Sequence, residues 1–475
     1  MQTMSQTEAI LKGDPKVVKA WVMYDWANSV YQLTISSTIF PIYYNTVTRH
    51  GDDFMVSFFG WKVINTVLYS WSIAVAYLIV AAGSPLFSSI ADYTGRRKGF
   101  MRAFTWIGAV SCGLLYFFDP QHIELGIVAF TLGTIGYGGS IVFYNSFLPV
   151  IAEPEDQDAI SARGYSMGYL GGVILLLFNL WMIMMPEFFG FPKESSQPAR
   201  ISFVTVCLWW IGFSTLTFRK LPKYIFSKRL HRENVISNGY RELRLVFRQV
   251  RESYQLSVYL LGFFFIMMGI LTTMFMAATF GEKELGLKEG VLIPTILVIQ
   301  LVAMFGAWFF AKLSGRIGNL KALIVSVVIW IVVCIYAFTI THAAGFIVAA
   351  FVIGIVMGGS QSLARSTYSK MLPETTDHTS FFSFYDVTEK LATVAGTFSF
   401  GIIEAITGSM RYSVLAITLF FGVGLVFLGM LLKTRQKQKG KRQKEKVRGS
   451  RNCSFFIKIS FLIPKSRSMR INFSL

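Results

Sequence analysis

The stretch "ADYTGRRKG", Ala91 to Gly99, occurs a second time in altered form as "AKLSGRIGN", Ala311 to Asn319. Gly95 and Gly315 occupy the same place in the two copies and lie 220 positions apart. Each copy follows a long apolar run and places an arginine directly after the glycine, which suits a tight turn at a membrane surface. A turn repeated in this way is typical of a chain built from two related halves.

A second pair of stretches supports the same repeat. "GGSIVFYNS", Gly138 to Ser146, returns as "GGSQSLARS", Gly358 to Ser366, again 220 positions later. Two independent matches at one offset are hard to obtain by chance. We therefore expect two pseudo-symmetric halves of equal helix number.

Composition places the chain in a membrane. Of its 475 residues, 53% are hydrophobic and only 15% are charged, which lies outside the range of ordinary soluble domains. About 20 apolar residues cross the hydrocarbon layer, and windows of that length predict an all-α membrane protein with twelve transmembrane helices. The predicted spans are 21–45, 67–92, 99–118, 123–148, 164–185, 201–219, 257–280, 290–313, 320–340, 345–369, 384–406 and 411–432.

The basic residues predict which side the turns face. The N-terminal arm carries three lysines, the turn after the second span carries Arg96, Arg97 and Lys98, and the loop 219–251 carries ten lysines and arginines. The turns near Asp119 and His342 carry none. Because short basic loops stay in the cytoplasm, and because no cleavable signal is visible, both termini are predicted to be cytoplasmic.

Four parts of the chain follow from these assignments. We expect a six-helix half over 1–220, a cytoplasmic linker over 221–256, a second six-helix half over 257–432 and a basic cytoplasmic tail without regular structure over 433–475. In the linker, apolar and basic residues recur at helical spacing, which predicts an amphipathic helix on the cytoplasmic face. The apolar positions are Leu243, Val246, Phe247, Val250 and Tyr254, and the basic ones are Arg241, Arg244, Arg248 and Arg251.

The net charge of +19 does not indicate a nucleic-acid partner. The tail holds 14 lysines and arginines against one acid, Glu445, and offers no folded reading surface. We expect it to be attracted to anionic membrane lipid. The four cysteines are isolated and predict neither a disulfide framework nor a metal cluster, and no cofactor motif is present.

The first repeated turn carries the most specific motif. "SSIADYTGRRKG", Ser88 to Gly99, resembles the loop signature of the major facilitator superfamily, G-x-L-A-D-R-x-G-R-R/K, with Ser88, Ile90 and Tyr93 as departures. The second copy carries Lys312 where the signature has an acid. The resemblance implies a twelve-helix transporter fold and a latch that locks the cytoplasmic ends of the two halves. Its residues here are Asp92, Gly95, Arg96, Arg97, Lys98, Gly315 and Arg316. Basic turns that serve topology alone are the alternative.

The first span carries a polar stripe. Polar side chains stand at i, i+3, i+4, i+7 and i+11, so they share one face of a helix. That face avoids lipid, because uncompensated polar groups in hydrocarbon cost several kcal/mol each. Interhelical hydrogen bonding and a place along a substrate path are both open, and for Asp25 we consider cation coupling, a contact to a substrate amine or structural pairing. The stripe consists of Asp25, Asn28, Ser29, Gln32 and Ser36, with Tyr31 beside it as a further candidate.

A motif in the same span indicates a particular branch of the superfamily. "YDWANSVY", Tyr24 to Tyr31, resembles the first-span hallmark of the autophagy-related vacuole-effluxer-like branch of the superfamily. The resemblance covers roughly Val17 to Leu432 and implies export of an amino-acid-like solute. Because the chain lacks the long soluble insertion of fungal members, we expect a bacterial cytoplasmic membrane.

Other polar residues within spans receive the same double interpretation. Arg365 is a candidate for a substrate carboxylate, but pairing with Asp386 and Glu389 across two helices is favoured. Lys390 is expected to extend toward the cytoplasm and is a weaker site candidate. Cavity lining and helix packing are both open for Tyr144, Asn145, Asn179, Gln300 and Gln361.

The sequence thus predicts a secondary active transporter of a small polar solute, with a proton as the candidate coupling ion. A membrane enzyme is disfavoured, since all five histidines fall in or near loops and no HExxH or GxSxG motif occurs. No nucleotide-binding motif is present either. A receptor or scaffold without transport, or a sugar or drug exporter of the same fold, is the alternative.

Overall fold

A computed structural model describes residues 12–48, 55–222, 235–375 and 377–460, and almost all of them are helical. The chain divides into two compact units, 1–428 and 429–475. The helices are α1 (Pro15–Val30), α2 (Ile39–Thr48), α3 (Asn65–Thr94), α4 (Arg97–Leu114), α5 (Ile123–Asn145), α6 (Leu148–Ile151), α7 (Gln157–Met184), α8 (Gln197–Lys220), α9 (Val235–Glu252), α10 (Tyr254–Leu285), α11 (Glu289–Ile317), α12 (Asn319–Thr339), α13 (Ala343–Ser369), α14 (His378–Thr407) and α15 (Met410–Ser460), with short η segments at Tyr31–Ser36, Leu115–Phe117 and Pro186–Phe189.

The twelve predicted spans correspond to twelve helical segments of the structure. Within the described ranges, ten helices are long and apolar enough to cross a membrane. The first span and α14 complete the twelve, and both are more polar for reasons visible in their sequences. The first span is interrupted by a π-helical stretch, Tyr31–Ser36, before α2 continues it. Helix α14 carries Asp386, Glu389 and Lys390 near its middle.

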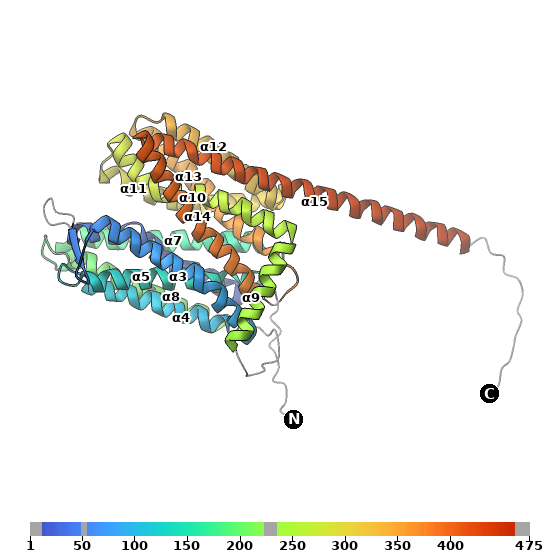
Figure 1. Cartoon of the computed structure of the whole chain (residues 1–475), viewed down its shortest axis with the longest axis horizontal. Coiled ribbons are helices and arrows are strands. Elements are labelled where there is room, and N and C mark those ends of the chain that lie inside the picture. Colours follow the sequence, from blue (N-terminus) through green and yellow to red (C-terminus); the bar gives the residue numbers. More distant parts are fainter. Residues whose placement is uncertain (1–11, 49–54, 223–234, 376, 461–475) are drawn as a thin grey trace, which may run out of the picture. The chain divides into compact units, whose positions relative to one another are not determined.

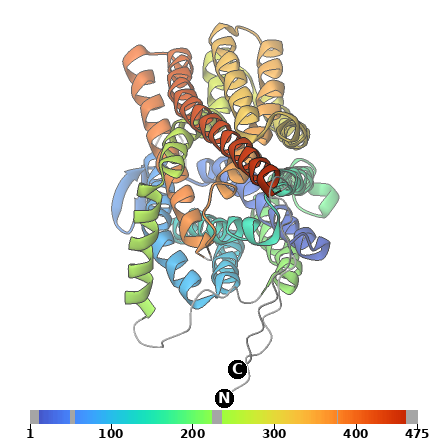
Figure 2. The same cartoon turned by 90° about the vertical axis from the view of Figure 1, so that its right-hand side faces the viewer.

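Within the first unit the helices form two groups. Helices α3, α4, α5, α7 and α8 gather on one side and α10 to α14 on the other, as Figure 1 shows. The groups meet where α3 packs on α14 and where α7 packs on α11 and α13. Figure 2 gives an end-on view of the same arrangement. A cavity or site shared by the two halves must therefore lie along these helices.

The linker contains the amphipathic helix that the sequence predicts. Helix α9 buries Val246 and Val250, leaves Arg244 and Arg248 exposed, and crosses the ends of the spans in both views (Figures 1 and 2). It packs on α3, α10 and α14, so it touches both groups of helices. Residues 223–234 of the linker lie outside the described residues.

Two elements differ from the sequence expectation. A β-hairpin follows the first span, with β1 (Met55–Phe58) antiparallel to β2 (Trp61–Ile64). Its two-residue turn has positive φ at both Phe59 and Gly60, the backbone that closes a tight hairpin. The other difference is the start of the basic tail, which continues α15 as a helix to Ser460. Lysine, arginine and glutamine are good helix formers, so this composition accommodates a helix. Residues 461–475 lie outside the described part.

A candidate solute cavity between the two halves

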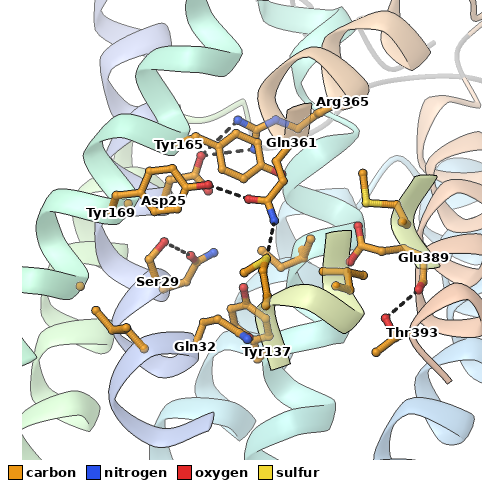
Figure 3. A pocket seen from close by; sticks show the side chains of 18 of the residues that line it. Asp25, Ser29, Gln32, Tyr137, Tyr165, Tyr169, Gln361, Arg365, Glu389 and Thr393 are labelled. Carbon is orange, nitrogen blue, oxygen red and sulfur yellow. Dashed lines mark hydrogen bonds and ion pairs between the residues drawn. The ribbon is translucent and has the colours of Figure 1, made fainter. Parts of the chain in front are cut away.

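A cavity of about 150 Å³ lies between the two groups of helices (Figure 3). Both halves contribute to its wall, which is mostly polar and aromatic. The side chains that line it include, from the first half, Asp25, Asn28, Ser29, Gln32, Tyr77, Tyr137, Asn145, Tyr165 and Tyr169, and from the second half Met267, Leu271, Met274, Phe275, Gln300, Gln361, Arg365, Tyr385, Glu389, Lys390 and Thr393.

An ion pair joins the halves at one end of the cavity. Arg365 of α13 donates from Nη1 and Nη2 to Oδ2 of Asp25 in α1, each at 3.3 Å. Tyr144 donates its hydroxyl to the same oxygen at 2.7 Å. Arg365 also donates to the side chain and backbone oxygens of Ser161, at 2.9 and 2.8 Å. The pair is buried, so its many hydrogen bonds are what make two charges tolerable there.

The surroundings of Arg365 hold the guanidinium in place. It lies over the rings of Trp21, Tyr144 and Tyr165, at 4.8, 5.5 and 4.2 Å from their centroids. Gly164 of α7 makes room for the pair, because a Cβ at this position would collide with the Asp25 carboxylate. No motif in the sequence marks Gly164 as part of the site.

This geometry corrects one sequence prediction. Arg365 does not pair with Asp386 or Glu389, as favoured from sequence, but with Asp25 in the other half. Lys390 instead pairs with both acids, at 3.3 Å from Asp386 and 3.1 Å from Glu389. Lys390 is also buried and lines the cavity rather than extending to the cytoplasm. The partners depend on how each helix is rotated about its axis. Residue spacing determines which side chains share a face, but it does not determine which neighbouring helix that face contacts.

The polar stripe of the first span faces the cavity. Asn28 and Gln32 line it, and the Nδ2 group of Asn28 is buried without a hydrogen-bond partner among the described residues. Across the cavity, Tyr169 donates its hydroxyl to Oε1 of Gln361 at 2.6 Å. Gln300 lines the wall beside them. Polar groups from four helices therefore converge on one small volume.

Three candidates do not line the cavity. Tyr31 packs against Tyr137 and shares a 2.8 Å hydrogen bond with Thr134, inside the first half. Asn179 accepts a hydrogen bond from Thr205 at 2.9 Å. Tyr144 is a third case, because it reaches the site only by holding Asp25. Sequence reasoning also missed the five lining tyrosines, since a tyrosine in a cavity wall has the same local sequence as one in a packed core.

The first repeated turn forms what we call the first junction. Asp92, fully buried, accepts hydrogen bonds from the backbone N–H and hydroxyl of Ser380 at 2.7 and 2.8 Å and from the Thr379 N–H at 3.4 Å. Those amides begin α14, in the other half. Arg97 donates to Asp92 at 2.7 Å. The Asp92 carboxylate thus caps a helix of the opposite half, where a negative charge is favourable.

The remaining residues of that turn have separate roles. Gly95 ends α3 in the left-handed conformation, with φ of 69°. Lys98 donates to the backbone carbonyls of Phe218 and Leu221 at 3.0 and 2.6 Å, and so ties the turn to the end of α8 rather than to lipid. Arg96 is exposed. The turn is therefore built by Gly95 and held by Asp92, Arg97 and Lys98.

The second copy of the turn is organised differently. Gly315 lies inside α11, and the residue with positive φ is Gly318, at 89°. Arg316 and Lys312 are exposed. The sequence therefore placed the second turn three residues too early, because it aligned the glycines by their repeat position.

A carboxylate that the sequence did not single out joins the halves here. Asp158 of α7 accepts from the Ser314 hydroxyl at 2.7 Å and from the Asn319 side-chain amide, and pairs with Lys370 at 2.8 Å. We call this contact the second junction. In the repeat, Asp158 corresponds to His378 and Asp92 to Lys312, so neither acid has an acidic counterpart.

The fold and this site define the class. A cavity lined by two six-helix halves that also meet at the repeated turns is the arrangement of a major facilitator transporter. The superfamily transporter FucP in its outward conformation superposes with a TM-score of 0.66 at 13% identity, over 88% of this chain and 99% of that one. The proton:xylose symporter XylE gives 0.67 at 12% identity, over 87% and 95%. These structures establish the fold.

The sequence comparisons establish the family. The profile described as "Vacuole effluxer Atg22 like" matches residues 13–444, and the chain belongs to this family of secondary transporters. An uncharacterized MFS-type transporter of Bacillus subtilis, YxiO, is 28% identical over 89% of this chain and 96% of its own length. Autophagy-related protein 22 of Kluyveromyces lactis is 24% identical over 90% and 94%.

Proposed function

We propose that this transporter exports a small zwitterionic solute of the amino-acid class from a bacterial cytoplasm, in exchange for protons, with both termini in the cytoplasm. The observation that carries the solute class is the pair of opposite charges on the cavity wall. Arg365 and Glu389 lie on different walls (Figure 3). A solute carboxylate can add to the partners of Arg365, which already pairs with Asp25, and a solute ammonium can pair with Glu389.

The size and lining of the cavity support a small polar solute. Its volume of about 150 Å³ is below the roughly 300 Å³ at which pockets for drug-sized ligands begin. The unpartnered amide of Asn28 supplies a hydrogen-bond donor that a bound solute would satisfy. A sugar or drug exporter of the same fold is the alternative, and a sugar makes no use of the opposite charges.

The direction follows from two arguments. The family profile is described as that of an effluxer, which favours export. The basic residues of the turns support a cytoplasmic position for the first junction, on the side from which the solute would enter. A receptor or scaffold without transport is disfavoured, because such a protein has no need of a polar cavity shared by two halves that meet at latches.

A thermal-shift screen tests the solute class. A ligand that binds only the folded chain raises its stability by about 2.7 kcal/mol at 100 times its dissociation constant. We expect common L-amino acids, but not sugars, to raise the melting temperature of the purified wild type and of Tyr31→Phe, whose side chain lies outside the cavity. Gln32→Leu removes a lining group and should lose the shift. Stabilisation by sugars alone, or an undiminished amino-acid shift in Gln32→Leu, contradicts the proposal.

A further inference from the structure

A second cluster of charges lies in the middle of α14, apart from the Asp25–Arg365 pair. The ammonium of Lys390 is 3.3 Å from Oδ1 of Asp386 and 3.1 Å from Oε1 of Glu389. Asp386 and Lys390 are buried, whereas the Glu389 side chain is 27% exposed and lines the cavity. One member of the cluster is therefore accessible from the solute space.

The charges of the cluster do not balance. Two carboxylates share one ammonium, so the fully ionised cluster holds one negative charge in excess within the membrane. The second carboxylate oxygen of Asp386, Oδ2, is buried and has no hydrogen-bond partner among the described residues. An excess buried charge of this kind is unfavourable unless a cation or a proton compensates it.

Among the residues that the structure describes, the neighbouring helices supply no cation that is free to compensate this charge. Tyr77 of α3, Tyr137 of α5 and Tyr165 of α7 line the same cavity, and the Tyr77 ring centroid is 5.4 Å from Lys390. The lining residues of α10 are apolar. Helix α9 meets α14 through Phe247 and Phe384. Arg365 also lines the cavity, but its charge is matched by Asp25.

We propose that the cluster formed by Asp386, Glu389 and Lys390 is the coupling-ion site of this transporter, and that it binds one proton or the ammonium group of the solute, but not both. A proton passes from water to the carboxylate pair and removes the excess charge. The ammonium of a solute does the same by pairing with Glu389. The ammonium half of this proposal rests on the proposed function, whereas the proton half does not.

The contrast with Asp25 supports the assignment. The sequence offers Asp25 as a candidate for cation coupling, but its carboxylate receives three hydrogen bonds and an arginine partner. A carboxylate paired in this way has no excess charge to compensate. Mutually exclusive binding at the α14 cluster also explains exchange, because the carrier must release a proton to take the solute and release the solute to take a proton.

The proton half is tested without any solute. Infrared difference spectra between acid and alkaline buffer report carboxyl groups that gain a proton. We expect a protonated-carboxyl band in the wild type that is lost in E389Q and in D386N. E404Q is the matched control, because Glu404 is on the same helix, pairs with Lys283 and does not line the cavity. A band that persists in both cluster variants overturns the proposal.

The competition is tested with radiolabelled common L-amino acids bound to purified protein at a series of pH values. If one proton competes with the solute, apparent affinity falls by about tenfold for each unit of acidification in the acid range. E404Q should retain this dependence. D386N carries no excess charge, like the protonated cluster, so it should bind with the low affinity of the acid range at every pH. A wild type that binds amino acids with no pH dependence refutes the competition. If no amino acid binds, the proposed function and the ammonium half of this inference are both refuted. The proton half is unaffected, because the infrared experiment tests it separately.

Discussion

The two junctions between the halves use the same principle with different partners. In the first, the Asp92 carboxylate caps the start of α14 by accepting hydrogen bonds from its backbone amides, and it pairs with Arg97 of its own half. In the second, Asp158 bonds to side chains of the α11–α12 turn and pairs with Lys370 of the other half. Both acids come from the first half, although the repeat relates each to a non-acidic residue of the second. The pseudo-symmetry thus preserves where the halves meet, not which residues make the contact.

Burial separates the two junctions in strength. Asp92 and Arg97 are 0% and 1% exposed, whereas Lys370 is 17% exposed beside Asp158. A charge that loses its partner at the first junction is not hydrated, so the free-energy cost of losing the partner is larger there. The first junction also caps α14, the helix that carries Asp386 and Glu389. Opening it would therefore release the N-terminus of the helix that carries the proposed coupling-ion site.

The largest effect is expected from Asp92→Asn. Removing one partner of a buried ion pair costs about 3–5 kcal/mol, and separation of the halves relieves that cost by hydrating Arg97. We expect transport to fall and the junction to open. Labelling of a cysteine introduced at Ser146, whose hydroxyl bonds to Thr379, measures the opening in a background without the native cysteines. Arg96→Gln, at the exposed neighbour, is the control. Unchanged labelling and transport in Asp92→Asn would remove the latch role.

A smaller effect is expected from Asp158→Asn. Its hydrogen bonds are charge-assisted, and their loss costs about 1.5–3 kcal/mol of stability. Lys370 is partly exposed, so water can hydrate its ammonium when the carboxylate is lost. The same cysteine labelling should therefore increase less than in Asp92→Asn. Asp156→Asn, an exposed acid two residues earlier, serves as the control. An effect larger than that of Asp92→Asn would show that burial does not rank the junctions.

The sequence predicted the parts of this molecule that depend on period and offset. The repeat gave the two halves, apolar windows gave the spans, and the stripe spacing placed Asn28 and Gln32 on a face that lines the cavity. It could not predict contacts that depend on how helices rotate against each other. Residue spacing favours the wrong acidic partners for Arg365. Nothing in the sequence distinguishes Asp158, because an acid at the start of a helix is common and its partners lie more than 150 positions away.

Substitutions at the repeated glycines have the smallest expected effects. The change in stability has opposite signs at Gly95 and Gly315. Gly95 has φ of 69°, a conformation that costs an L-residue about 1–2 kcal/mol. Gly315 sits in helical backbone with open space around its Cα, so Gly315→Ala loses nothing and gains about 0.5–1 kcal/mol from helix propensity. We expect Gly95→Ala to lower the melting temperature of the purified protein and Gly315→Ala to raise it slightly.

This pair tests whether the two turns are equivalent, as their sequences indicate, or differ, as their backbones do. The turn of the second copy is made by Gly318, with φ of 89° and ψ of 148°, a conformation that is essentially restricted to glycine. Gly318→Ala should therefore behave like Gly95→Ala, and Gly315→Ala should not. Transport rates add a second measurement. Gly95→Ala should lower the rate, because a distorted first turn displaces Asp92 from α14. Gly315→Ala should not lower it, because Gly315 makes none of the hydrogen bonds of the second junction. If Gly315→Ala destabilised the protein and Gly318→Ala did not, the second turn would have to follow the repeat register after all, and the placement of Asp158 against Ser314 and Asn319 would need to shift with it.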